Sequence, residues 1–397
     1  MDIHKEELIV NGKLLTLKSA NLLLAGFGAL EQMGVEAKTL DVKKALMVTD
    51  QGILKSGIGA KVKAVLEAND VKVDLFDGVQ SDPDIACCEA CINKAKSGTY
   101  DLIVGIGGGS SMDIAAITSV MCTNDGAVQD YFGVNLLKKP GIPTFLVATT
   151  SGTGAEVTPN AILTDTDAKL KKGIVSPFIL PRAAVVDPTL TVSMPSRVTS
   201  FTGMDALTHA IESFTSMNAT PLTDMYAREA IRLIGRSLRT AVARGDKLEA
   251  RYEMSIGSLY AGISLANAGV GAVHALAYPL GGEFNVPHGI ANGMLLPYVM
   301  EFNVLGDIPK FAEVAALMGE NVLGLSQIEQ AQCAVEAVKD LVADIDMPKT
   351  LAEIDIPKEA LPRLAEASID VTRLMNNNPR TVKVDDALQI FENAFGA

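Results

Sequence analysis

The chain contains only four histidines, and three of them fall between residues 209 and 288, close after an aspartate. Asp205 and His209 lie four residues apart in GMDALTHAIE (203–212), so on a helix their side chains share one face. His274 and His288 follow in GVGAVHALAYPLGGEFNVPHGIANGMLLP (269–297). One carboxylate and three imidazoles carry a charge of −1 and suit divalent iron, zinc, nickel or cobalt. Ordinary core histidines are the alternative, but a metal site explains all four residues at once.

A second candidate site is the glycine-rich stretch DLIVGIGGGSSMDIAAI (101–117), which predicts a buried strand, a tight turn and a helix. Glycines let a ligand approach the backbone, while the serines and the free N–H groups of a helix start donate to phosphate oxygens. The loop departs from G-x-G-x-x-G because Ser110 replaces the third glycine. A strand-to-helix turn that holds no ligand is therefore the alternative.

Two further features favour the nucleotide interpretation of this loop. TTSGTGAEVT (149–158) is another run of small hydroxyl and glycine residues directly after a predicted strand. Asp50 ends the first predicted strand, where a carboxylate accepts hydrogen bonds from ribose hydroxyls and repels a 2′-phosphate. The pattern thus favours NAD over NADP.

The elements that must position these residues change character along the chain. Short apolar runs alternate with helical stretches in the first half, which predicts parallel β-α-β units with strands at 45–50, 71–76, 101–106, 144–149 and 183–188. From about residue 195 the apolar residues recur with the period of a helix, as at 223–243, 248–266 and 326–345. We predict an α/β dinucleotide-binding domain over residues 1–190 and an all-helical metal-binding domain over residues 191–397.

Composition excludes several classes of partner. The 34 Lys and Arg residues against 47 Asp and Glu residues give a net charge of −13, which disfavours nucleic acid and anionic lipid surfaces. MDIHKEELIV has neither the basic nor the apolar region of a signal peptide, and long apolar runs are lacking, so we expect a cytoplasmic protein without a membrane partner. Cys87, Cys88 and Cys91 are expected to be buried, reduced thiols.

Several of these motifs, in order along nearly the whole chain, resemble the iron-containing (group III) alcohol dehydrogenases. The shared stretches are VTDQGILKSG (48–57), FDGVQSDPD (76–84), GGGSSMD (107–113), TTSGTGAEVT (149–158), GMDALTHAIE (203–212), ANGMLLPYVMEFN (291–303) and NNNPR (376–380). The resemblance implies a dehydroquinate synthase-like fold, with the site in the cleft between an α/β domain and a helical domain.

The resemblance also implies roles for individual residues. The family's metal ligands fall on Asp205, His209, His274 and His288. Lys171 matches a lysine near the nicotinamide ribose, and Asn160 and Leu265 would face the substrate. The other cofactor contacts fall on Asp50, Gly107, Gly108, Ser110, Asp113, Thr149, Thr150 and Thr153. The chain departs from the family at Tyr278, where many members have a second histidine beside the metal.

The implied activity is NAD-dependent interconversion of a small primary alcohol and its aldehyde, with Fe²⁺, or Zn²⁺ or another divalent ion, binding the substrate oxygen. We expect a homodimer or larger homo-oligomer. The alternatives are a hydroxyacid-oxoacid transhydrogenase, a reductase of an anionic small aldehyde recognised by Arg373 or Arg380, a metal-dependent lyase without net redox, and a non-catalytic helical scaffold.

Overall fold

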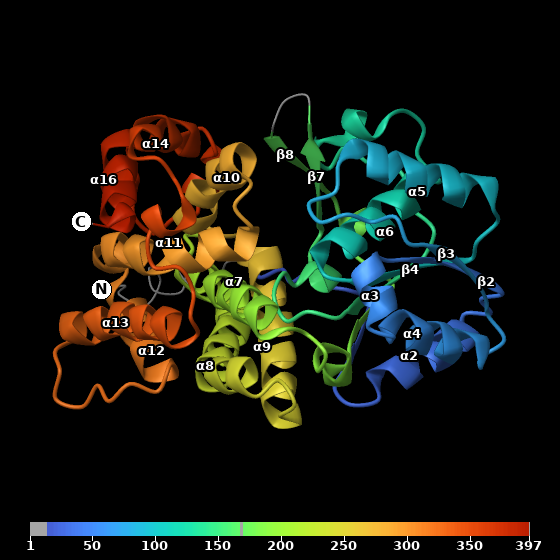
Figure 1. The fold of residues 1–397 in the computed structure, drawn as a ribbon, viewed down its shortest axis with the longest axis horizontal. Coiled ribbons are helices and arrows are strands. Elements are labelled where there is room, and N and C mark those ends of the chain that lie inside the picture. Colours follow the sequence, from blue (N-terminus) through green and yellow to red (C-terminus); the bar gives the residue numbers. More distant parts are fainter. Residues whose placement is uncertain (1–13, 167–169, 397) are drawn as a thin grey trace, which may run out of the picture.

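The computed structural model describes residues 14–166 and 170–396, which form an α/β half and a helical half side by side (Figure 1). The α/β half contains a six-stranded sheet in the order β1-β9-β6-β4-β2-β3, and all of its strand pairs are parallel. Its strands are β1 (Leu22–Ala25), β2 (Lys44–Val48), β3 (Lys72–Phe76), β4 (Leu102–Gly107), β6 (Thr144–Ala148) and β9 (Ala183–Val186). All five predicted strands are confirmed, and β1 is an addition.

Helices cover both faces of this sheet. Met47 and Val104 pack on one face with α2 (Ala29–Thr39) and α4 (Ile58–Glu67). Leu46 and Ile103 pack on the other with α5 (Ile85–Ser97) and α6 (Gly109–Met121). Successive strand residues therefore enter two different apolar cores, which is why the strands are continuous apolar runs. A short helix, α3 (Gln51–Lys55), and the 3₁₀ turns Val128–Tyr131, Ala155–Val157, Pro177–Ile179 and Pro188–Thr191 complete this half.

A small second sheet, which the sequence analysis did not predict, lies beside α6. It has the order β5-β8-β7, and β7 and β8 pair antiparallel. Its strands are β5 (Gly133–Val134), β7 (Asn160–Asp165) and β8 (Leu170–Val175). Two residues of the predicted site, Asn160 and Lys171, belong to it.

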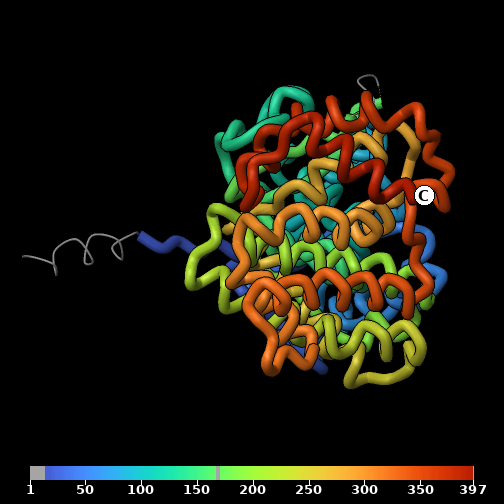
Figure 2. The backbone as a smooth tube through the Cα atoms, turned by 90° about the vertical axis from the view of Figure 1, so that its left-hand side faces the viewer, coloured from blue at the N-terminus to red at the C-terminus, as the bar shows by residue number. Residues whose placement is uncertain are grey.

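The described residues after β9 contain helices and turns but no strand. Predicted helices 223–243, 248–266 and 326–345 correspond to α8, α9 and α13, and one large apolar core joins the helices. In Figure 2, where the left-hand side of Figure 1 faces the viewer, the C-terminal segments drawn in orange and red stack across the front of the molecule. The helices are α7 (Ser196–Thr215), α8 (Pro221–Ala243), α9 (Leu248–Ala268), α10 (Ala272–Phe284), α11 (His288–Asn303), α12 (Ile308–Leu317), α13 (Gln327–Asp344), α14 (Leu361–Ile369), α15 (Thr372–Met375) and α16 (Val384–Phe395), with 3₁₀ turns at Val304–Gly306, Ala352–Ile354 and Lys358–Ala360.

The predictions about thiols and membrane spans are also tested by the fold. Cys87, Cys88 and Cys91 are free and buried in α5, as expected, and burial raises the pKa of the Cys91 thiol to about 12. Among the described residues, no single helix is long and apolar enough to span a bilayer, although α9 and α10 together meet that test across a bend of 100°.

The two halves meet where glycine packs against glycine. Gly154, at the end of the TTSGTG loop, has a φ of +61°, and a Cβ on Gly262 of α9 would lie 2.8 Å from the Cα of Gly154. Such a separation is shorter than real Cβ contacts, so both positions require glycine. This contact presses the loop against α9, which packs in turn on α7.

We predict that Gly262→Ala lowers the free energy of unfolding by about 1–3 kcal/mol, because the added methyl group must separate two backbones. The steric cost outweighs the gain in helix propensity of about 1 kcal/mol. Urea denaturation would measure the effect. Gly281→Ala in α10 is the matched control, since its Cβ meets nothing closer than 3.6 Å and should be neutral or stabilising. Equal stability of the two variants would contradict the packing argument.

Candidate metal centre and the adjoining cleft

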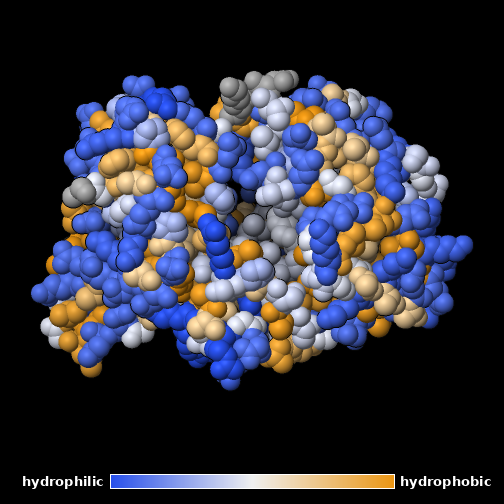
Figure 3. All heavy atoms as spheres, in the orientation of Figure 1, coloured by the Kyte–Doolittle hydropathy of each residue, from blue (hydrophilic) through white to orange (hydrophobic). Residues whose placement is uncertain are grey.

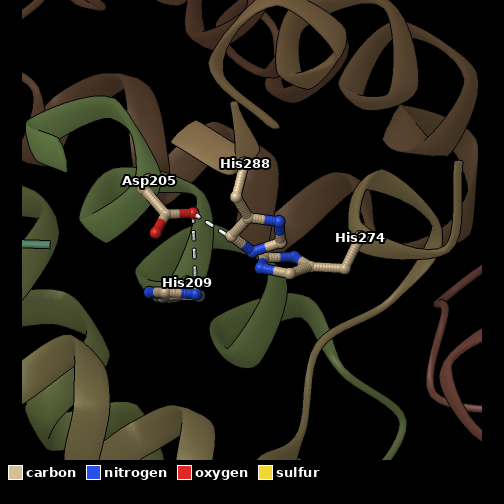
Figure 4. Close-up of side chains that lie close together, drawn as sticks. All are labelled: Asp205, His209, His274 and His288. Atoms are coloured by element: carbon tan, nitrogen blue, oxygen red, sulfur yellow. Dashed lines mark ion pairs between the residues drawn. The ribbon is translucent and has the colours of Figure 1, made fainter. Parts of the chain in front are cut away.

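The structure brings together the four residues that the sequence singled out as metal ligands. Asp205 and His209 project from one face of α7, His274 from the first turn of α10, and His288 begins α11 (Figure 4). One potential ligand atom from each lies within 4.8 Å of the others. The first three residues are buried and His288 is partly exposed. We call these four residues the tetrad.

The electrostatics of the tetrad favour the protonation states that a metal requires. Burial lowers the pKa of His288 to about 4 and also lowers the pKa of His209, so both imidazoles are neutral at pH 7. Burial opposes ionisation of Asp205, but the neighbouring histidines and a hydrogen bond from Asn292 bring its pKa down to about 2. A carboxylate among neutral imidazoles is the form that binds a cation without first releasing protons.

Glu212 orients one of the histidines and was missed by the sequence analysis. Its Oε2 lies 2.5 Å from Nδ1 of His274, and its Oε1 accepts the backbone N–H of Val273 at 2.7 Å. The carboxylate thus holds the proton of His274 on Nδ1 and leaves Nε2 for a metal. Glu212 also satisfies an N–H group at the start of α10. Its spacing, seven residues after Asp205, was the available signal, since it shares the same face of α7.

His209 is oriented by the other half of the molecule. Its Nδ1 lies 3.3 Å from the carbonyl oxygen of Gly152, which accepts the imidazole proton when Nε2 faces Asp205. Gly152 belongs to the TTSGTG loop. The metal centre and that loop therefore share a hydrogen bond as well as the Gly154–Gly262 contact.

Asn292, also missed from sequence, shows that the tetrad has more acceptors than protein donors. Its Nδ2 lies 2.7 Å from Oδ1 of Asp205, 3.0 Å from Nε2 of His288 and 3.1 Å from Nε2 of His274. An amide nitrogen has two protons and cannot serve three acceptors. Its Oδ1 is buried and has no hydrogen-bond partner. A divalent cation bound by carboxylate and imidazole lone pairs fits this donor set.

The tetrad opens into a cleft of about 450 Å³ between the two halves, visible as a hollow in the centre of Figure 3. Both halves line it, and seven further residues of the predicted site do so: Ser110, Asp113, Thr153, Asn160, Lys171, Leu265 and Tyr278. Lys171 forms an ion pair of 2.5 Å with Asp82. Tyr278 lies beside the tetrad, with its ring centroid 6.4 Å from that of His288.

The remaining predicted cofactor contacts lie outside the cleft lining, along the carboxyl ends of β2, β4 and β6. Asp50 caps α3 and lies 3.5 Å from the Ser111 hydroxyl. A Cβ on Gly108, at the start of α6, would lie 3.4 Å from Thr150 Oγ1, so these two residues are adjacent. Together with Gly109, which was not predicted, and with Ser110 and Thr153, which line the cleft, these contacts make up what we call the strip: Asp50, Gly107, Gly108, Gly109, Ser110, Thr149, Thr150 and Thr153.

The carboxylate of Asp113 forms a hydrogen bond within the protein. Its Oδ2 accepts the backbone N–H of Ile162 at 2.9 Å and so ties α6 to β7. Burial raises its pKa to about 7, against the opposing effects of that hydrogen bond and of Lys171. This carboxyl therefore positions the small sheet over the cleft.

A second buried carboxyl, Glu156, makes stability depend on pH. Burial raises its pKa from 4.5 to about 7, so between these values the native state binds more protons than the unfolded chain. The free energy of unfolding consequently falls as pH rises through this window. We predict that the fall between pH 5 and pH 8 is about 2–3 kcal/mol smaller in Glu156→Gln. Denaturation at both pH values measures it, and the exposed Glu366→Gln should behave as wild type.

We predict that Glu212→Ala weakens metal binding by about 10- to 100-fold, because His274 loses the group that fixes its orientation. Competition for Fe²⁺ or Zn²⁺ with a chromophoric chelator measures this affinity without turnover. Glu229→Ala is the control, since that carboxylate pairs with Arg232 on the surface of α8. An affinity within about twofold of wild type would show that Glu212 does not orient the ligand.

Comparison with known proteins agrees with this architecture. Residues 21–188 match the family described as "Iron-containing alcohol dehydrogenase", and residues 199–395 match "Fe-containing alcohol dehydrogenase family, C-terminal". The two matches span both halves of the structure. The chain therefore belongs to the iron-containing alcohol dehydrogenase family.

Individual relatives cover almost the whole chain. Long-chain-alcohol dehydrogenase 1 of Geobacillus thermodenitrificans is 41% identical over 93% of this chain and 94% of its own. A crystal structure of 1,3-propanediol oxidoreductase superposes with a TM-score of 0.94 at 38% identity, covering 96% of this chain and 100% of that one. Sulfoacetaldehyde reductase from Bifidobacterium kashiwanohense, solved in complex with NAD⁺, gives 0.87 at 28% identity, covering 97% and 100%.

Proposed function

We propose that this protein is an NAD-dependent, iron-dependent oxidoreductase that interconverts a small primary alcohol and its aldehyde by hydride transfer. The observation that carries the proposal is the buried tetrad opening into the same cleft as the glycine and threonine strip. Membership of the iron-containing family and the NAD⁺ complex of the Bifidobacterium relative support both cofactors.

In the proposed mechanism Asp205, His209, His274 and His288 hold Fe²⁺, with Zn²⁺ or another divalent ion as a possible substitute. When bound, the ion supplies a Lewis acid that lowers the pKa of an alcohol or polarises a carbonyl. The ligand set has a charge of −1, so the occupied site is left at about +1. Glu212 and the Gly152 carbonyl keep two of the imidazoles in the tautomer with Nε2 toward the site.

The strip holds the nucleotide in this proposal. Gly108, Gly109 and Ser110 present the N-terminus of α6, where backbone N–H groups and the helix dipole favour the pyrophosphate. Asp50 accepts from the adenosine ribose and disfavours a 2′-phosphate. Thr153 and Lys171, which line the cleft with the tetrad, would hold the nicotinamide end, and Asn160 and Leu265 of the same lining would contact the substrate.

The proposal includes the organisation of the chain. Residues 1–190 form the nucleotide-binding domain and residues 191–397 the metal-binding domain, because the strip belongs to the first range and the tetrad to the second. We also propose a cytoplasmic homodimer or larger assembly. The assembly is supported by β1, which is an edge strand of the sheet and carries the exposed Leu23. An exposed edge strand can pair with another copy of the chain.

The test begins with metal content after purification without oxygen, followed by NADH oxidation with a panel of short aldehydes before and after chelation. We expect about one metal ion per chain, loss of activity on chelation and its recovery with Fe²⁺. Asp205→Ala should abolish turnover while NADH still binds, because the strip is untouched. The exposed Asp246→Ala is the control. Full activity in Asp205→Ala, or in chelated wild type, would refute the metal assignment.

A further inference from the structure

The cleft contains one cation whose charge no neighbouring carboxylate offsets. Its described lining holds two cationic side chains, Lys171 and Arg373. Lys171 pairs with Asp82 at 2.5 Å. Arg373 forms no ion pair with any carboxylate in the described part of the chain. The two other lining carboxyls do not reach it, since Asp205 belongs to the tetrad and Asp113 accepts from the Ile162 backbone.

The side chain of Arg373 is exposed at the rim of the cleft, but the backbone that carries it is held in place. It lies on the single turn of α15, next to Leu374, which is buried in a small apolar cluster with Val270 and Ala275. That cluster packs α15 against α10, and Leu265 and Tyr278 lie at its border. The guanidinium lies close enough to the Tyr278 hydroxyl to lower its pKa, against the larger opposing effect of burial, and both residues line the cleft. Arg373 therefore projects from an anchored backbone toward a partner whose ring lies beside His288.

Tyr278 can act as a second donor at this place. Burial raises the pKa of its hydroxyl, which stays protonated, and the Arg373 charge lies nearby. Its own proton has no acceptor among the described residues. The position where many relatives place a histidine thus carries a phenol that lines the cleft together with an unpaired arginine.

The other arginine that the sequence suggested has a structural role. Arg380 donates from Nη1 to the Phe302 carbonyl at 2.7 Å, and its guanidinium lies 3.9 Å from the centre of the Phe302 ring. It does not line the cleft. Of the two candidates, only Arg373 faces the space where a substrate would lie.

We propose that Arg373 and Tyr278 form an anion-binding subsite, and that the substrates of this enzyme are short aldehydes or alcohols that carry a terminal carboxylate or sulfonate. The proposal rests on the proposed function, because the reacting end of the substrate lies at the tetrad. A guanidinium presents a planar pair of N–H donors that matches such oxyanions, and charge-assisted hydrogen bonds are the stronger kind. The substrate then spans from the tetrad to Arg373, across the Tyr278 ring.

The kinetic test compares charged aldehydes with neutral analogues of similar shape. The pairs are 4-oxobutanoate with 4-methylpentanal, and sulfoacetaldehyde with 3,3-dimethylbutanal. We expect kcat/KM of wild type to favour at least one anion over its analogue by about 10- to 100-fold. The pair with the larger ratio identifies carboxylate or sulfonate as the preferred group. A ratio of one or less for both pairs overturns the proposal and leaves the proposed function intact.

Variants assign the preference to the subsite. Arg373→Met should bring the ratio of anionic to neutral kcat/KM close to one. Arg373→Lys should retain part of the preference for the anion, because lysine keeps the charge but lacks the planar pair of N–H donors. Arg363→Met removes the same charge from the surface of α14, where Arg363 pairs with Glu283, and should keep the wild-type ratio. An unchanged ratio in Arg373→Met overturns the proposal.

A binding measurement separates the two proposals if wild type reduces none of these aldehydes. Calorimetric titration of the metal-loaded protein with 4-hydroxybutanoate and with 2-hydroxyethanesulfonate, in the presence of NADH, reports binding without turnover. We expect binding of at least one anion that weakens about 10-fold or more in Arg373→Met but not in Arg363→Met. No binding of either anion, or equal binding in Arg373→Met, overturns the subsite independently of activity.

Discussion

The rest of the structure depends on one constraint. Four metal-ligating side chains are buried close together, and the protein around them supplies too few hydrogen-bond donors for their lone pairs. Lone pairs of Asp205 and three imidazoles converge within 4.8 Å, and the one amide among them, from Asn292, cannot serve them all. Buried acceptors without donors are costly, so the site is stable only if surrounding groups hold it together or a cation fills it. The long helix α7 meets this requirement. One face of α7 carries two ligands and Glu212, which fixes a third ligand from α10.

The position of the strip depends on the same helix. His209 donates to the carbonyl oxygen of Gly152, and the Gly154–Gly262 contact presses that loop onto the helical half. Hydride transfer requires two bound groups to meet within a few tenths of an ångström of the productive geometry. Backbone packing without intervening side chains is a rigid way to set such a distance. The glycines of the TTSGTG loop thus set the relative placement of the strip and the tetrad.

Sequence periodicity predicted most of the local secondary structure, and the scarcity of histidine pointed to the metal ligands. Four of the five strands were visible because both of their faces are apolar, whereas β3 (KVDLF) carries Lys72 and Asp74 and is only partly buried. The tetrad was visible because histidine is scarce in this chain. β7 and β8 were missed because LKKGIV and NAILTD carry polar residues and lie only partly buried over the cleft. Glu212 and Asn292 act on residues far along the chain, and no spacing rule connects Glu212 to His274. Such contacts depend on how helices cross, which periodicity does not encode.

Because of the overall charge, the cleft attracts an anion only through local groups. A net charge of −13 repels NAD and any acidic substrate at long range, but salt screens this repulsion within a Debye length of about 8 Å. Each acidic residue of the described cleft lining already has a partner. Asp82 pairs with Lys171, Asp113 accepts from the Ile162 N–H, and Asp205 belongs to the tetrad. Besides the tetrad itself, the described lining offers an anion the N-terminus of α6 and the side chain of Arg373. An acidic protein can therefore hold an anionic cofactor and an anionic substrate, provided that each charge meets its own donors at short range.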